Sequence, residues 1–266
     1  PGEGSSEAFN ERLVAFIRIG TDYKDNFYQI EIPLKPTDYE PNISNKLSAE
    51  SVWIPDKNSI EVSLDMLAKL KAKALQRASL GEVSYFDEEL NFIDEYSLIS
   101  ELPGIKKYKF AIKGNPSLGN IRSLMIGVKN PSINLGQSLC GEVWFNELRL
   151  SDMDNEGGWA ATLAVDSNIA DFMNISATAR QSTSGFGNIE QGPSERDKED
   201  RKQYDLVSNI NVGQLFPKKW GLNIPFNFGQ GEEYIKPEFD QQYRDINLDS
   251  RIELAESQQD KDAILR

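Results

Sequence analysis

The sequence predicts a mainly β protein, in which an antiparallel β-sandwich or jelly-roll-like domain with one amphipathic helix precedes two amphipathic β-hairpins. Short runs rich in β-branched and aromatic residues recur through the first half, and turn formers such as Asn115-Pro116 and Asn130-Pro131 separate them. In the second half, apolar and polar residues alternate over four longer segments, which is typical of strands with two different faces.

An acidic stretch that ends in two glycines, residues 152–158, divides these halves. We therefore expect a sandwich domain over residues 1–151, a linker over 152–158, two hairpins over 159–233 with a polar loop at 182–203, and a final loop over 234–266 with a weak helix at 249–265.

The predicted strands of the first domain are residues 12–19, 26–34, 51–54, 107–112, 121–128 and 141–150. Several short strands around one core favour a sandwich or jelly roll. Between them, residues 81–102 set acidic groups among aromatic ones, and we expect a loop or a short helix there.

A helix is predicted over residues 62–78, with Ser63 as its N-cap. Its apolar stripe consists of Met66, Leu67, Leu70, Ala74 and Leu75, and its opposite face carries Lys69, Lys71, Lys73 and Arg77. Such a helix could contact anionic lipid or an acidic partner. A helix that packs on a sheet and solvates its charged face explains the same pattern, and we favour this second interpretation.

The alternating segments of the second half are residues 159–166, 172–181, 204–212 and 222–228. Strands of roughly 9 to 11 residues can cross a bilayer when tilted by about 45°, and Trp159, Tyr204, Phe216 and Trp220 would suit its interfaces. A water-exposed sheet with one buried face alternates in the same way. The polar positions hold Asn and Thr rather than Lys and Glu, which favours a pore lining modestly.

Composition argues against several functions. The chain has 266 residues and a formal net charge of -13, which opposes binding to nucleic-acid phosphates. It contains no histidine, so Ser-His-Asp and Cys-His catalysis and His-ligated zinc are excluded. No apolar run is long enough for a transmembrane helix. The chain begins without methionine or a signal sequence, and we expect an internal segment of a longer protein.

Few residues offer chemistry, and we expect no enzyme and no cofactor, catalytic or metal site. Glu142 and Glu147 are the most suggestive carboxylate pair, but their spacing places them on opposite faces of a regular strand. Asp152, Asp154 and Glu156 alternate as calcium ligands could, without the twelve-residue calcium-loop pattern, so calcium binding stays open. The lone Cys140, in an apolar setting, is expected to be a buried, inert thiol.

Several motifs resemble, in order, those of the SprA/Sov family. The motifs are KGNPSLG at 113–119, LMIGVKNP at 124–131, EVWFNELRLSD at 142–152, EGGWAA at 156–161, SGFGNIEQ at 184–191, LFPKKWG at 215–221 and Ile224-Pro225. Members of that family are the giant outer-membrane translocon proteins of the type 9 secretion system in Bacteroidota, first known through gliding motility. The similarity covers most of residues 107–266 and is looser before them.

The resemblance implies a very large transmembrane β-barrel in the outer membrane that passes folded cargo proteins to the cell surface, with soluble domains in the periplasm or at the surface. It also implies partners: the remainder of the barrel, a PorV-like shuttle protein, a periplasmic plug protein, cargo with a C-terminal sorting domain, and outer-membrane lipid. Nucleic acid is not among them.

On this reading the hairpin residues divide into three sets. The predicted lipid-facing residues are Leu163, Val165, Met173, Ile175, Leu206, Ile210, Val212, Leu222, Ile224, Phe226 and Phe228. The predicted interfacial aromatic residues are Trp159, Phe216 and Trp220. The predicted lumen-facing residues are Thr162, Asn174, Thr178, Asn209, Asn211, Asn223 and Asn227.

Two other functions compete with this one. An extracellular carbohydrate-binding jelly-roll module could stack Trp53, Trp144 or Tyr108 on sugar rings, although Trp144 in its apolar run suits a core better. A hydrolase is disfavoured, because the chain lacks histidine and a convergent carboxylate pair.

Overall fold

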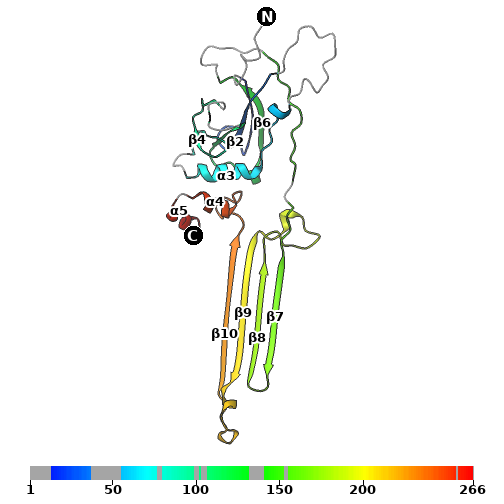
Figure 1. Cartoon of the computed structure of the whole chain (residues 1–266), viewed down its shortest axis with the longest axis vertical. Helices are drawn as coiled ribbons and strands as arrows, with labels where there is room; N and C mark the ends of the chain where they lie inside the picture. Colours follow the sequence, from blue (N-terminus) through cyan, green and yellow to red (C-terminus); the bar gives the residue numbers. More distant parts are fainter. Residues whose placement is uncertain are drawn as a thin grey trace. The chain divides into compact units, whose positions relative to one another are not determined.

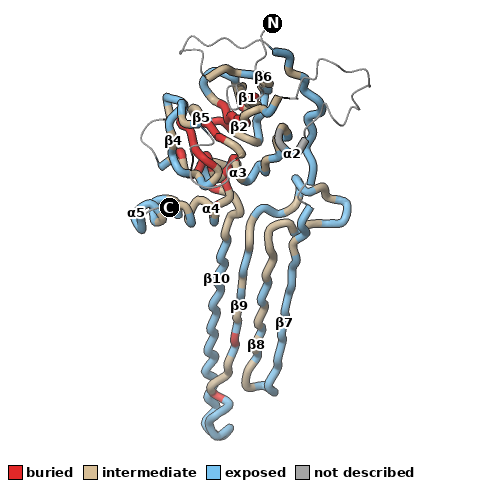
Figure 2. The backbone as a smooth tube through the Cα atoms, turned by 45° about the horizontal axis from the view of Figure 1, so that its top comes forward, coloured by how far each residue is buried: buried red, intermediate tan, exposed pale blue. Residues whose placement is uncertain are grey.

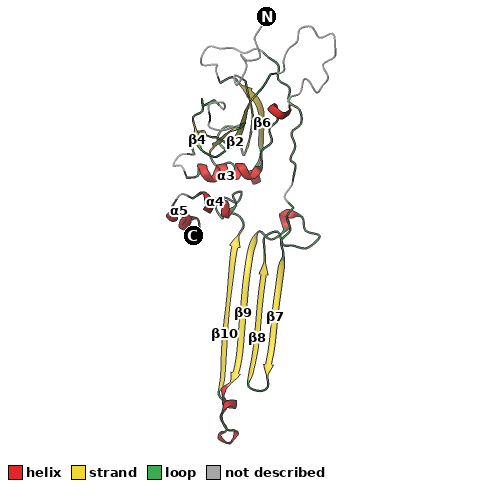
Figure 3. Ribbon diagram, viewed as in Figure 1, coloured by secondary structure: helices red, strands yellow, loops and turns green. Residues whose placement is uncertain are grey.

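The computed structural model describes residues 13–36, 55–76, 80–98, 102, 107–131, 141–152, 155–255 and 257–265. It confirms the prediction of a mainly β protein with few helices, because its strands form two antiparallel sheets (Figure 3). The chain divides into two compact units. The first comprises residues 1–146 together with 242–266, and the second comprises residues 147–241.

The first unit contains a six-stranded sheet in the order β4-β3-β5-β2-β1-β6 (Figure 1). Its strands are β1 (Val14–Gly20), β2 (Phe27–Pro33), β3 (Ser84–Phe86), β4 (Phe92–Ile93), β5 (Lys109–Lys113) and β6 (Ser123–Lys129). Four predicted strands are thereby confirmed to within two residues, as β1, β2, β5 and β6. The predicted strand at 51–54 lies outside the described residues.

The expectation of a loop or short helix at 81–102 is wrong, because this stretch contains β3 and β4. Tyr85 of β3 pairs with Ala111 of β5, and Phe86 pairs with Phe110. The local sequence is too short and too acidic to reveal a strand, and the pairing with β5 supplies what local propensity lacks.

The core of the first unit lies between the sheet and helix α3 (Leu64–Ala74) (Figure 2). Ser63 caps α3 as predicted, since its hydroxyl accepts a hydrogen bond from the Met66 amide at 3.1 Å. The buried residues that pack together come from both layers: Tyr28, Ile30, Leu67, Leu70, Ala74, Phe86, Phe110 and Ile112. The second layer over this face of the sheet is thus a helix.

The predicted strand at 141–150 is not formed. These residues belong to no strand, and Trp144, predicted to suit a core, exposes 63% of its surface. Glu147 has a φ of 55°, in the left-handed region, which interrupts an extended chain in the middle of the segment. A strand also requires a neighbour for its amides, and the described sheets provide none here.

The second unit contains a four-stranded sheet in which consecutive strands are neighbours, in the order β10-β9-β8-β7. The strands are β7 (Ala160–Ile169), β8 (Met173–Ser182), β9 (Glu199–Asn211) and β10 (Pro225–Pro237). Both predicted hairpins are confirmed. β9 begins five residues before the predicted strand, because Arg201 pairs with Glu199 and Glu233 and holds the charged residues in the ladder. β10 begins after residue 224, so residues 222–224 are not strand.

The remaining elements are short. Helices α2 (Pro55–Asn58), α4 (Leu248–Leu254) and α5 (Gln258–Ile264) are accompanied by single 3-10 turns at Leu118–Asn120, Pro193–Glu195, Val212–Leu215 and Lys218–Trp220. Two helices therefore replace the single weak helix predicted at 249–265. In the described part of the chain, no helix has the length and apolarity needed to cross a membrane.

Candidate functional site

One face of the four-stranded sheet is apolar. Residues directly opposite in an antiparallel ladder lie on the same face, so the register assigns each side chain to a face. It aligns Ile169, Met173, Ile210 and Phe226 in one row across all four strands. This apolar face continues with Leu163, Val165, Ile175, Ala177, Ala179, Leu206 and Phe228, and is interrupted by Ser167 and Ser208 and, on β10, by Gln230 and Glu232.

The opposite face is polar and carries a straight row of four asparagines. Asn168 pairs with Asn174, Asn174 with Asn209, and Asn209 with Asn227, so this asparagine row crosses all four strands. All four residues are exposed. A shallow depression beside the row is lined by residues that include Asp166, Ser176 and Val207. An amide both donates and accepts hydrogen bonds without carrying charge, so this row presents a neutral, strongly hydrated surface.

Asp166 borders the asparagine row, and the other charged groups of the polar face lie toward its opposite end. Arg201 lies 2.7 Å from Glu199 and 3.1 Å from Glu233, which links β9 to β10. Arg180 of β8 pairs with Gln203 of β9 in the same region. The polar face of these strands contains no aromatic residue.

The predicted lipid-facing and lumen-facing sets separate cleanly wherever they fall in strands. Leu163, Val165, Met173, Ile175, Leu206, Ile210, Phe226 and Phe228 share the apolar face, and Thr162, Asn174, Thr178, Asn209, Asn211 and Asn227 share the polar face. Val212, Leu222, Asn223 and Ile224 lie in the connection between β9 and β10, outside the strands. Asn168 lies outside the predicted sets, because the predicted first strand ends at Asp166 whereas β7 continues to Ile169. The alternation continues to Ile169 and could have revealed it.

Aromatic side chains lie toward both ends of the sheet. Phe216 and Trp220 stack at 5.9 Å in the connection between β9 and β10. Trp159 precedes β7, at the opposite end of the ladder. Tyr204 lies on the apolar face toward that end, and its hydroxyl hydrogen-bonds to Glu232 at 2.8 Å. Tyr234, which was not among the predicted aromatic residues, follows on the same face of β10.

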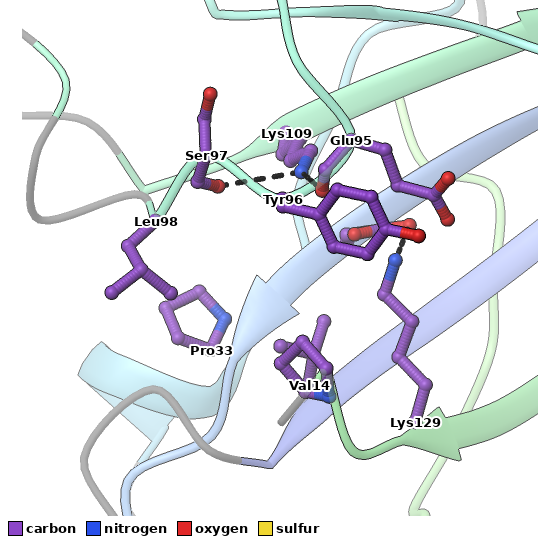
Figure 4. Close-up of a pocket in the computed structure, with 10 residues that line it drawn as sticks. Val14, Pro33, Glu95, Tyr96, Ser97, Leu98, Lys109 and Lys129 are labelled. Carbon is purple, nitrogen blue, oxygen red and sulfur yellow. Dashed lines mark hydrogen bonds and ion pairs between the residues drawn. The ribbon is translucent and has the colours of Figure 1, made fainter. Parts of the chain in front are cut away.

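The first unit contains a cluster of charged groups around a small cavity (Figure 4). Glu31 and Lys109 of this cluster are paired in the ladder and lie on the sheet face opposite the one that packs on α3. The Glu31 carboxylate, with 2% of its side chain exposed, lies 2.6 Å from the Lys129 ammonium group and accepts a hydrogen bond from Gln29 at 2.6 Å. Lys109 donates to the backbone oxygens of Glu95 and Ser97. Burial lowers the pKa of Lys109. The cavity beside these groups measures about 30 Å³ and has room for water but not for a substrate.

The other candidate residues do not form a site. Glu142 and Glu147 lie on the exposed segment at 141–150, and Glu147 pairs with Arg149 at 3.6 Å. Among the described residues, no three His, Cys, Asp or Glu side chains are grouped so that they could hold a metal ion. Asp154 and Cys140 lie outside the described residues.

The aromatic residues considered for sugar binding have different surroundings. The Tyr108 hydroxyl accepts a hydrogen bond from the Glu61 amide at 3.1 Å, and its ring packs against Phe110 at a tilt of 47°. Trp144 is exposed on its own segment, and Trp53 lies outside the described residues.

Comparison with known proteins gives one result for nearly the whole chain. The family model SprA_N, described as a motility related/secretion protein, matches residues 2–252. No curated protein matches the chain.

Proposed function

The chain belongs to the SprA_N family of motility-related and secretion proteins, and from this premise we propose that β7–β10 form part of the wall of an outer-membrane barrel that conducts folded proteins to the cell surface. The family's association with motility and secretion indicates a protein of the cell envelope. The role in a translocon and the passage of cargo through it go beyond this association and belong to the proposal.

The separation of the two sheet faces is the observation that carries the proposal. A strand in a barrel wall needs hydrocarbon side chains toward lipid and polar side chains toward the lumen. The apolar face extends over four rows, from Ile169 to Leu163 along β7. At a rise of about 3.4 Å per residue this band measures about 20 Å along the strand, or about 15 Å across the membrane at a tilt of about 40°. Phe216 and Trp220 beyond one end, and Trp159 beyond the other, would extend it to the two interfaces.

The sheet would need further strands in such a wall. Within the described ladders, β7 and β10 each have one unpaired edge. An unpaired strand edge is not viable in hydrocarbon, because its amides and carbonyls find no hydrogen-bond partner there. The proposal therefore requires the remainder of the barrel as the first partner. A PorV-like shuttle protein, a periplasmic plug protein and cargo with a C-terminal sorting domain complete the assembly.

The polar face would act as a passive lining and not as a catalyst. Folded cargo must slide past the wall without adhering to it. The polar face offers no aromatic side chain on which cargo could stack, and the asparagine row offers neutral amides that hold water. The lining residues would thus keep the pore hydrated.

Two neighbouring residues of β9 test the proposal. Leu206 lies on the apolar face and Val207 on the polar face. If the apolar face meets lipid, Leu206→Lys costs about 2–4 kcal/mol at the bilayer midplane, whereas Val207→Lys enters water. We expect Leu206→Lys to lower the amount of protein assembled in the outer membrane and the secretion of cargo, and Val207→Lys to leave both near wild type. Equal tolerance of both lysines would contradict the proposal.

A further inference from the structure

Residues 242–255 return from the four-stranded sheet to the first unit and bring one carboxylate into its interior. Asp245 lies 2.8 Å from the Lys71 ammonium group of α3, and their side chains expose only 7% and 3% of their surfaces. The prediction that Lys71 belongs to a solvated helix face is therefore wrong. A lysine buried this far requires a counter-charge, and here the counter-charge comes from 174 residues away in the sequence.

Several polar groups of the first unit surround the Asp245 carboxylate. One carboxylate oxygen accepts a hydrogen bond from the Leu118 amide at 3.1 Å and lies 3.5 Å from the Tyr28 hydroxyl. The Lys71 ammonium group also donates to the Pro116 backbone oxygen at 2.8 Å. The acceptor surface is thus built from three separate places, β2, α3 and the 3-10 turn after Pro116.

Apolar contacts accompany the ion pair. Ile246 is completely buried and Leu248 is nearly so. The ring of Tyr243 lies 5.2 Å from the Lys71 nitrogen. Farther along, Gln76 donates to the backbone oxygen of Leu254, at the end of α4. The segment therefore contacts the first unit from Tyr243 to Leu254, through Lys71 in the last turn of α3 and through Gln76 just beyond the helix.

The segment adds buried side chains of its own, Ile246 and Leu248, beside the main core cluster of the first unit. The cluster of side chains packed between the sheet and α3 draws its members from residues 19–118, and none comes from residues 242–266. Opening of a docked segment can therefore cost less free energy than unfolding of the sheet.

The docked segment follows the two hairpins in the sequence. β7–β10, at residues 160–237, lie between Lys71 and Asp245 in the sequence. The two hairpins are therefore an insertion within the first unit, and the pair can close only after the chain has passed through both hairpins.

We propose that residues 242–255 form a latch, a separable segment that closes the first unit through Asp245 and Lys71 and that can open while the six-stranded sheet stays folded. The surface built from β2, α3 and the turn after Pro116 binds this chain's own segment through the Asp245 carboxylate, with Ile246 buried beside it. The latch goes beyond the proposed pore and does not depend on it.

Hydrogen exchange read by mass spectrometry tests the latch in the complete chain. Lys71→Met leaves the buried Asp245 carboxylate without its counter-charge, and breaking such a pair raises the open population by about 100-fold or more. We expect exchange of residues 246–254 to quicken by about that factor while β2 and β5 keep their protection. The double variant Lys71→Met with Asp245→Leu replaces the pair by apolar groups and should recover most of the lost protection.

The control is Asp262→Asn, which changes an exposed carboxylate on α5 and should leave all exchange unchanged. Unaltered exchange of residues 246–254 in Lys71→Met would overturn the proposal. So would equal loss of protection in the latch, β2 and β5, since the segment would then be an inseparable part of the core.

The wild-type chain gives a second measurement that needs no variant. With increasing urea, amides of residues 246–254 should exchange through a smaller opening than amides of β2 and β5. A single common opening for both sets would refute the latch even if Lys71→Met failed to fold.

Discussion

Asp22 shows how one side chain fixes a turn of the first unit. Its carboxylate accepts hydrogen bonds from the amides of Lys24 and Asn26 at 2.9 and 3.1 Å, and also from the Asp25 amide and the Asn26 side chain. These bonds stabilise the charged form, with the Asp25 amide contributing most, and they lower the pKa of Asp22 well below its usual range. The turn between β1 and β2 thus depends on an ionised aspartate.

We predict that Asp22→Asn lowers stability in a pH-dependent way. The pKa of Asp22 is lower in the folded chain than in the unfolded chain. Its ionised form therefore contributes stability at pH values above the usual aspartate pKa of about 3.9. That contribution is lost as pH falls from about 4 toward the folded value. Urea unfolding of both proteins between about pH 7 and pH 2.5 should show a difference at neutral pH that shrinks below about pH 4. A difference independent of pH would contradict this account.

Single residues also mark the limit of what the sequence predicts. Lys71 fits a charged helix face by its spacing, yet it is buried because its partner Asp245 comes from a distant part of the chain. A local periodic pattern holds no information about a partner so far away in the sequence. Ser63 was predicted correctly because an N-cap depends only on its own helix.

Helix α3 provides the clearest prediction at the scale of an element. Loss of the Ser63 hydroxyl removes the hydrogen bond to the Met66 amide, so Ser63→Ala should lower the free energy of unfolding of the first unit by about 1 kcal/mol. Ser63→Asp retains an acceptor at the same position and should stay near wild type. Denaturant unfolding followed by circular dichroism measures both. If the two variants proved equally stable, the cap would contribute nothing.

Strands with strict alternation were predicted from the sequence. Strands that form only through pairing with another strand were missed. β7 and β8 follow from their sequences, and the ladder places their predicted faces together. The short strands β3 and β4 exist because β5 offers an edge to β3. The segment at 141–150 has the composition of a strand and yet forms none, since Glu147 breaks its extended conformation. Strand pairing between distant segments is the information that a local pattern lacks.

At the scale of the whole molecule, the sequence places the change of character near residues 152–158, and the structure divides its two units at residue 146 and again at 241. No local pattern announced that residues 242–266 belong to the first unit. That membership rests on contacts such as Lys71 with Asp245, which only a folded chain brings together. The two faces of the candidate site were easier to predict from the sequence, because consecutive residues of a strand alternate between its faces.

The central claim is that one face of the four-stranded sheet meets lipid and the other meets water. Cysteine accessibility along β8 tests it most directly, since β8 is paired on both sides and alternates strictly from Met173 to Arg180. In a Cys140→Ser background, single cysteines replace Asn174, Ile175, Ser176 and Ala177 in the native outer membrane, and a water-soluble thiol reagent is applied.

The account predicts labelling at positions 174 and 176, on the polar face, and protection at positions 175 and 177, on the apolar face. Unfolding of the protein in a denaturing detergent should abolish the protection. Uniform labelling at all four positions in the intact membrane would contradict the account, because both faces of the sheet would then be exposed to water.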